Sequence, residues 1–294
     1  MNIIKKIGRL SDKCWALGFV RGGMQAVMES DHWEVDWVKM PEDRWYADPF
    51  VLDVTDDEIL LLVEDYDYKV RKGVISLLHI NRATMDITSR KVLLELPTHL
   101  SFPAIWRKDG HVYVYPESAK SGRLDLYEYH PDTESLTFVR TICDDVVWDP
   151  YITEEFGEPM LFTSAKNDFQ MDIYKWDDKK KRFVSGLAVP SEKPNSRMGG
   201  AVFEYNGKIY YPAQNCEQTY GGAIDVKRVE WGGVMCKVHD VKTILSPHPK
   251  YKLGMHTLNE YKGIVVIDVH GYRHTIVGPI IEWLVGLKKR LFRK

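Results

Sequence analysis

A structural unit of roughly fifty residues recurs five times along this sequence of 294 residues, and the repeat restricts the fold. Each copy opens with a short apolar strand, passes a turn with Gly or acidic residues, and continues into strands that alternate with period two. The anchor of the unit falls at Pro49, Pro103, Pro150, Ala201 and Thr257, at intervals of 54, 47, 51 and 56 residues. A helical solenoid would show a period of about 3.6 residues instead. The sequence therefore predicts an all-β fold, a five-bladed β-propeller with four-stranded blades.

Turn residues separate the first and second strands of three copies, as tight hairpins require. These turns are Lys108-Asp109-Gly110, Phe156-Gly157 and Asn206-Gly207. Fourth strands are expected at 91–96, 135–142 and 182–189. The fifth copy ends before four strands are complete. We expect the N-terminal segment, which includes HWEVDWVKM, to supply the missing outer strand and close the ring, because closure removes exposed sheet edges.

Composition excludes several classes of protein. Lys and Arg total 40 and Asp and Glu total 42, so the net charge of −2 gives no general attraction for nucleic acid. The four cysteines lack the paired spacing of zinc or redox sites. The N-terminus lacks the apolar core of a signal peptide, and no apolar run of about 18 residues exists. These features predict a reduced, cytoplasmic protein.

The C-terminal segment differs from the rest of the chain. We expect a propeller over 1–278 and a short basic amphipathic helix over 279–294. Its apolar and cationic residues are Ile280, Ile281, Trp283, Leu284 and Leu287, and Lys288, Lys289, Arg290, Arg293 and Lys294. Two interpretations stay open. The helix docks on its own domain, or it attaches the protein peripherally to a membrane surface, at the inner face of the plasma membrane.

Residues at the starts of first strands line the central channel of a propeller, so they converge on one mouth. The predicted convergent set is Asp48, His99, Ser101, Asp149, Arg197 and His256. A second ring is expected from the ends of second strands and their loops, namely Glu64, Asp65, Glu117, Lys166, Gln214, Asn215, Tyr220, Asp268 and His270. Trp45 is an additional candidate for substrate binding, and the cations Lys72, Arg123, Arg197 and Arg273 are candidates for a phosphate group.

Two carboxylates in a partly desolvated channel shift each other's pKa, which suits glycosidic acid and base chemistry. Asp48 and Asp149 each precede a proline, so capping of a turn is the structural alternative. His256, His270 and His274 fall close together but lack the H-E-x-x-H spacing, and we predict no metal ion and no cofactor. The chain also lacks a G-x-S-x-G elbow, a Walker loop and a G-x-G-x-x-G motif.

At WYADPF and WDPYI the sequence resembles the five-bladed furanosidase superfamily, which includes glycoside hydrolase families 43 and 32. The resemblance implies that Asp48 is a catalytic base or nucleophile and that Asp149 orients the site or tunes the pKa of its partner. In those hydrolases a glutamate that opens blade four protonates the leaving group. Here SRMGGAVF offers Gly199 and Gly200 instead, so the general acid is missing from its expected place.

A closer resemblance extends over nearly the whole chain. W-x-ADPF, SFPAIW, YPES, RMGGAVF, QNC with YGGAI, and HTLN follow one another as in the N-terminal propeller region of glucosamine inositolphosphorylceramide transferases and bacterial relatives near polysaccharide genes. The resemblance implies a carbohydrate-active role and leaves the reaction open.

Three functional hypotheses follow. The first is a glycosyltransferase-like enzyme that moves a sugar from a nucleotide-sugar donor to a glycan or lipid-linked acceptor in surface polysaccharide or glycolipid biosynthesis, with Asp48, Asp149 and Glu117 as catalytic residues. The second is a glycoside hydrolase in which Glu117 or Glu64 supplies the displaced general acid. The third is a non-catalytic glycan-binding propeller.

Overall fold

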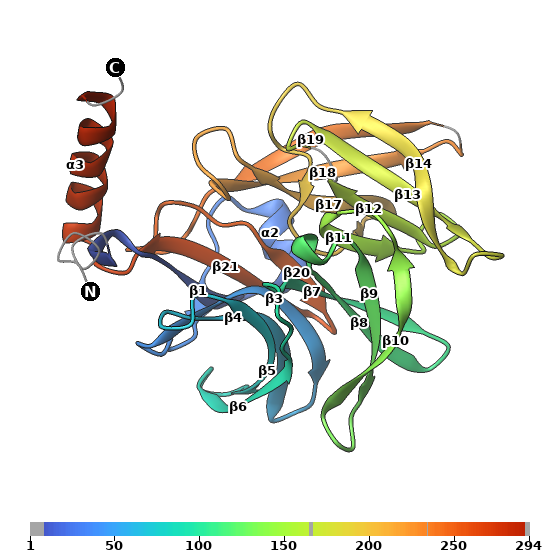
Figure 1. Ribbon diagram of the computed structural model, residues 1–294, viewed down its shortest axis with the longest axis horizontal. Helices are drawn as coiled ribbons and strands as arrows, with labels where there is room; N and C mark the ends of the chain where they lie inside the picture. Colours follow the sequence, from blue (N-terminus) through green and yellow to red (C-terminus); the bar gives the residue numbers. More distant parts are fainter. Residues whose placement is uncertain (1–8, 165–166, 234, 292–294) are drawn as a thin grey trace.

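The computed structural model describes residues 9–164, 167–233 and 235–291 and forms a five-bladed β-propeller. Figure 1 shows the inner strands β3, β7, β11 and β20 gathered at the centre, with β6, β10, β14 and β19 at the periphery. The predicted fold class and blade number are confirmed. Short helical elements are η1 (Arg9–Ser11), α2 (Gly23–Glu29), η2 (Ala119–Ser121) and α3 (Val277–Leu291).

Each blade is an antiparallel sheet whose strands follow one another from the channel outward. Blade one comprises β3 (Arg44–Val54), β4 (Glu58–Asp67), β5 (Gly73–Asn81) and β6 (Ile87–Leu94). Blade two comprises β7 (Ser101–Lys108), β8 (His111–Glu117), β9 (Leu124–His130) and β10 (Ser135–Cys143). Blade three comprises β11 (Trp148–Thr153), β12 (Met160–Ser164), β13 (Gln170–Asp177) and β14 (Arg182–Pro190).

Blade four contains β15 (Arg197–Met198), β16 (Phe203–Tyr205), β17 (Lys208–Asn215), β18 (Ala223–Trp231) and β19 (Cys236–Ile244). Its first strand is divided, because both β15 and β16 pair with β17 while the backbone between them leaves the sheet. At this break Gly200 has φ 143°, and a Cβ there would lie 2.2 Å from the carbonyl oxygen of Leu258. The expected continuous strand is interrupted because the chain passes directly against the backbone of blade five.

The N-terminal segment closes the ring, as predicted, and supplies two strands. Blade five comprises β20 (Leu258–Tyr261), β21 (Ile264–Tyr272), β1 (Lys13–Val20) and β2 (Val35–Trp37). The sequence predicts only the outer strand, which is β2. Strand β1 lies between β2 and β21 and pairs with β21 along its full length. The two ends of the propeller are therefore joined within one sheet, and no exposed edge remains between them.

First strands of blades one, two and three share a β-bulge at the residue before their proline. The bulged residues Asp48, Phe102 and Asp149 have φ values of 49°, 45° and 46°. A proline cannot donate to a strand ladder, and a bulge accommodates it while changing the direction of the backbone. Because non-glycine residues pay a conformational cost in this region, tertiary contacts must hold all three in place.

Large aromatic side chains fill the spaces between blades. Phe102, Tyr115, Phe162 and Tyr211 are almost fully buried, and all four pack in one continuous cluster that joins blades one to four. Most of the abundant aromatic rings therefore serve the core, where they bury large apolar areas. Helix α3 begins at Val277, two residues before the predicted boundary, and residues 292–294 of the predicted helix lie outside the described residues.

Leu17→Ala tests the contribution of strand β1 to the propeller. The Leu17 side chain is fully buried, so we expect a loss of about 2–5 kcal/mol in the free energy of unfolding, measured by urea denaturation. Val241→Ala is the control, because Val241 is half exposed on the outer strand β19 and should change stability by about 0.5 kcal/mol or less. Equal unfolding midpoints for the two variants would contradict the role of β1.

Candidate functional site

Asp48 lies at the base of the channel mouth and is 3% exposed. The bulge in β3 turns its carboxylate toward blades two and five. Its Oδ2 accepts the backbone N–H of Phe102 at 3.0 Å, and its Oδ1 accepts the hydroxyl of Thr257 at 3.1 Å. Burial raises the pKa of Asp48 to about 7, although the neighbouring His256 acts in the opposite direction. Asp48 therefore changes protonation near neutral pH.

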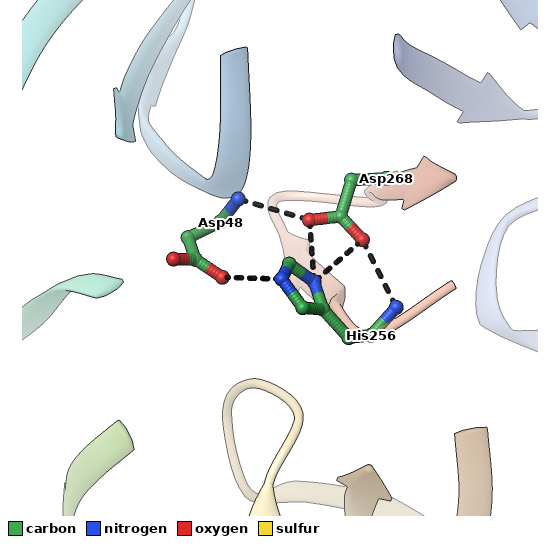
Figure 2. A group of neighbouring side chains, drawn as sticks. All are labelled: Asp48, His256 and Asp268. Atoms are coloured by element: carbon green, nitrogen blue, oxygen red, sulfur yellow. Dashed lines mark hydrogen bonds and ion pairs between the residues drawn. The ribbon is translucent and has the colours of Figure 1, made fainter. Parts of the chain in front are cut away.

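His256 lies between two carboxylates, as Figure 2 shows. Its Nδ1 is 2.8 Å from Asp268 Oδ2, and its Nε2 is 3.6 Å from Asp48 Oδ1. Burial disfavours a charged ring, but the carboxylates of Asp268 and Asp48 outweigh burial and raise the pKa of His256 to about 9. Asp268 is buried too, yet His256 and the backbone N–H donors around it hold its pKa below the ordinary value. The site thus contains a buried imidazolium paired with Asp268 and adjacent to Asp48.

Trp15 covers the face of this imidazole and was not identified from the sequence. The two rings stack with centroids 3.7 Å apart, and Trp15 also contacts His270 at 4.3 Å. Trp15 is on β1, the strand that the sequence analysis did not place beside β21. The apolar run KCWALGFV indicates a buried strand, but the repeat does not show that this strand pairs with β21.

Asp149 organises a second group on blades two, three and four. Its Oδ2 accepts Arg197 Nε at 2.7 Å and Gln214 Nε2 at 2.9 Å. Its backbone N–H donates to Glu117 Oε2 at 2.7 Å. Burial, with the nearby Asp149 carboxylate, raises the pKa of Glu117 well above its usual range and favours the protonated form. The two predicted catalytic acids of this group therefore adjoin each other in the structure.

A cation and two aromatic rings form one side of the mouth. The Arg197 guanidinium lies 5.3 Å from the ring of Tyr220 and 5.5 Å from that of Trp148. Tyr220 is half exposed and meets His256 edge to face at 5.7 Å. Within the described chain, the terminal nitrogens of Arg197 make no hydrogen bond. They are available to an anionic group that enters the mouth.

Blade one contributes a polar pair to the opposite side. His99 Nε2 lies 3.0 Å from Glu64 Oε1, and His99 Nδ1 accepts the backbone N–H of Gly73 at 2.9 Å. Nε2 faces Glu64, and the hydrogen bond with the Glu64 carboxylate raises the pKa of His99 above its ordinary value. Trp45 stacks on Tyr66 at 4.6 Å, on the first two strands of the same blade.

Several predicted residues have local partners instead. Lys72 pairs with Glu95, Arg123 pairs with Asp125, and Arg273 donates to the carbonyl of Glu42. Asn215 donates to Asp225 within blade four, and Ser101 is paired with Glu117 in strand register. Lys166 lies outside the described residues. Within the described chain no contact joins Lys72, Arg123 or Arg273 to the central carboxylates, and their roles in substrate binding stay predictions.

Asp48, His256 and Asp268 offer three ligand atoms within 4.8 Å of one another. Asp268 already accepts the backbone N–H groups of Asp48, His256 and Thr257, and His256 Nδ1 faces its carboxylate. A metal ion bound by these three atoms would have to displace the His256 imidazolium from the Asp268 carboxylate. His270 Nε2 lies 3.1 Å from the carbonyl oxygen of Gly221, and burial lowers the pKa of His270 to about 4. We therefore interpret the cluster as a hydrogen-bonded ion pair.

Comparison with known families identifies this chain over most of its length. Residues 38–252, which cover blades one to four, match the family model described as glucosamine inositolphosphorylceramide transferase 1, N-terminal. The chain is 25% identical over 203 residues to glucosamine inositolphosphorylceramide transferase 1 of Oryza sativa subsp. japonica, covering 64% of this chain and 26% of the relative. It is 28% identical over 152 residues to the protein of that name from Arabidopsis thaliana, covering 47% of this chain and 20% of the relative. The chain thus spans about a quarter or less of these relatives.

Solved structures with a similar fold include glycoside hydrolases. A thermostable family-43 glycoside hydrolase superposes with a TM-score of 0.53 at 14% identity, covering 74% of this chain and 84% of that one. An α-L-arabinofuranosidase from Clostridium thermocellum superposes with a TM-score of 0.51 at 15% identity, covering 75% of this chain and 80% of that one. At such identities the likeness establishes the propeller fold.

The pH dependence of stability tests the buried imidazolium. A folded-state pKa of about 9, against an ordinary 6.5, means that the contribution of His256 is complete below pH 6.5 and is lost as pH rises to about 9. We expect a loss of about 3 kcal/mol in the free energy of unfolding over that interval. The raised pKa of Asp48 affects stability at lower pH, between its ordinary value of 3.8 and about 7. Urea denaturation at pH 6.5 and 9.5 measures the difference.

His256→Gln should remove this loss above pH 6.5, whereas His32→Gln, in an exposed loop, should retain it. An unchanged pH dependence in His256→Gln would show that another group causes the effect.

Gly200→Ala tests why blade four has no acid at its first strand. The added Cβ would meet the backbone of Leu258, so we expect a loss of about 3 kcal/mol or more in unfolding free energy. Gly110→Ala is the matched control, since Gly110 also has positive φ but has no atom within 4 Å of the added Cβ, and should cost about 1 kcal/mol. Similar losses in both variants would remove the steric explanation.

Proposed function

Because the chain belongs to the family of the N-terminal region of glucosamine inositolphosphorylceramide transferase 1, we propose that it is a glycosyltransferase-like enzyme. It transfers a sugar from a nucleotide-sugar donor to a glycan or lipid-linked acceptor, in surface polysaccharide or glycolipid biosynthesis. The channel mouth around Asp48 and Asp149 is its active site. The relatives named as transferases are about four times as long as the matched segment, so the proposal rests on the site itself.

The setting of the Asp48 carboxylate carries the proposal, because it is buried where blades one, two and five meet and accepts hydrogen bonds from Phe102 and Thr257. A general base is most effective when its pKa lies near the working pH, and burial raises that of Asp48 to about 7. An ordinary aspartate would be a weaker base by about three pKa units. His256 and Thr257 hold the carboxylate from one side and Phe102 from another, which fixes its orientation.

The reaction proceeds by attack of an acceptor hydroxyl oxygen on the anomeric carbon of the donor. The bond from this carbon to the acceptor oxygen forms, and its bond to the donor phosphate breaks. The hydroxyl proton passes to Asp48, and the bonding electron pair leaves with the phosphate oxygen. Arg197 stabilises the departing phosphate through its free terminal nitrogens.

The break in blade four favours a phosphate leaving group over an alkoxide. A sugar alkoxide needs a protonating acid, whereas a nucleotide phosphate leaves as a stable anion. A side chain at Gly199 would lie 2.6 Å from Ile224 Cδ1 and 2.8 Å from the carbonyl oxygen of His256, and Gly200 is equally crowded. Steric clashes therefore exclude a glutamate side chain at the position of the hydrolase acid. Arg197 lies two residues before Gly199 in the sequence.

Asp149 and Glu117 act on the donor side of the proposed site. Asp149 orients Arg197 and Gln214 by accepting a hydrogen bond from each. Gln214 Oε1 is buried and has no partner among the described residues, so it can accept a sugar hydroxyl. Burial and the Asp149 carboxylate raise the pKa of Glu117, and in its protonated form Glu117 donates a hydrogen bond to the substrate.

Glycoside hydrolysis is the second candidate, favoured by the protonated state of Glu117. In that reaction Asp48 activates water or attacks the sugar, and Glu117 protonates the leaving alkoxide. Glu64 is less suited to this role because it accepts a hydrogen bond from His99.

Asp48→Asn tests the proposed catalytic base. With a panel of sugar nucleotides and acceptor glycans, we expect it to lower donor consumption, followed by mass spectrometry, by about 10²–10⁴-fold, since an amide cannot accept the proton. The control is Asp53→Asn, on the same strand β3 but exposed and paired with Lys262, and it should retain wild-type turnover.

Absence of any donor binding by the wild-type protein would refute the transferase proposal. Cleavage of aryl glycosides that depends on Asp48 and Glu117 would support the hydrolase instead. Glycan affinity unaffected by Asp48→Asn, with no turnover of either substrate class, would indicate a binding propeller.

A further inference from the structure

Helix α3 leaves the propeller beside the channel mouth. It follows β21, which carries Asp268 and His270 of the site. Between the two elements Arg273 donates to the carbonyl of Glu42, just before β3, and its guanidinium lies 4.3 Å from the Tyr68 ring in the β4–β5 connection. Figure 1 shows α3 standing clear of the blades, next to η1. Its base is therefore fixed to the mouth side of blades one and five.

One face of α3 is anchored to the protein. Gly278 packs against the Tyr272 ring, where an added Cβ would lie 2.7 Å from Tyr272 Cβ. The Tyr272 hydroxyl bonds to Glu282, and Lys13 pairs with the same carboxylate at 3.9 Å. These contacts define the direction in which the remaining faces point.

The described remainder of α3 presents an apolar stripe to solvent. Its members recur at helical spacing of three or four residues. They are Val277, Ile280, Trp283 and Leu284, which are 42%, 53%, 64% and 48% exposed, and Ile276, in the turn just before α3, extends the stripe and is 80% exposed. Isolated exposed apolar residues are ordinary, but a contiguous stripe on a projecting helix marks a binding surface.

The sequence that follows this stripe is strongly cationic. Five of the last seven residues, 288–294, are Lys or Arg, although the whole chain has a net charge of −2. Apolar residues with an interfacial Trp, followed by clustered cations, fit the acyl and headgroup layers of an anionic bilayer. Across the described residues no helix is long and apolar enough to span a membrane.

We propose that α3 binds in the plane of an anionic membrane surface, with its exposed apolar stripe in the headgroup layer and the following cations on lipid phosphates. Since the base of α3 is fixed to the mouth side of the propeller, docking holds the channel mouth near the bilayer. The acceptor class this geometry favours is a lipid-linked one. Membrane binding itself does not depend on the proposed reaction.

Co-sedimentation of the full chain with vesicles tests the proposal. We expect binding to vesicles of phosphatidylcholine with phosphatidylglycerol, and at least about tenfold weaker binding to phosphatidylcholine alone. Ile280→Ser with Trp283→Ser should weaken binding by roughly tenfold or more. Lys288→Gln, Lys289→Gln and Arg290→Gln together should weaken it by roughly a hundredfold and reduce its salt dependence.

The control is Met235→Ser, which removes an apolar side chain of similar exposure from the β18–β19 turn of blade four and should bind as wild type.

Light scattering examines the alternative partner, a second copy of the chain. The proposal would be overturned if the wild-type protein formed a dimer and bound no vesicles, and if Ile280→Ser with Trp283→Ser dissociated that dimer. Equal binding to both vesicle types would overturn its electrostatic part. Vesicle binding without turnover would contradict only the proposed reaction.

Discussion

Hydrogen bonds between polar groups of neighbouring blades hold the ring together at the channel. In each link a side-chain oxygen of one blade accepts an N–H from a neighbouring blade, and the links together pass through all five blades. They run from Asp268 to Asp48, from Asp48 to Phe102, from Glu117 to Asp149, from Asp149 to Arg197, and from Asn259 to Ala201. Three of the donors are the bulged residues before prolines, so the bulges and the ring depend on each other.

The same links give the candidate site its electrostatic character. A buried carboxylate is costly unless it is paired or protonated, and each acid at the channel meets this requirement differently. Asp268 pairs with the imidazolium of His256, Asp149 pairs with Arg197, and the pKa values of Asp48 and Glu117 are raised. Asp48 and Glu117 therefore both link neighbouring blades and have raised pKa values, and the stability of variants at Asp48 or Asp149 should be measured together with their activity.

Much of the site could be predicted because position within a repeat determines position in a propeller. Equivalent strand starts brought Asp48, Asp149, Arg197 and His256 to one mouth, as the repeat implied. Position within the repeat does not determine where the side chains of Lys72, Arg123 and Arg273 point, and their roles in substrate binding stay predictions. Their side chains lie on connecting loops, where local partners such as Glu95 and Asp125 compete for a flexible cation and the repeat gives no constraint.

The sequence by itself determined the fold class, the number of blades and the acids at the strand starts, because spacing and alternation are local properties of the chain. The tertiary structure decided which distant segments meet. It placed β1 beside β21, and so Trp15 against His256, and it brought the backbone of Leu258 against Gly200. Those contacts join residues more than fifty positions apart, and they depend on how the ring closes and how closely its blades pack.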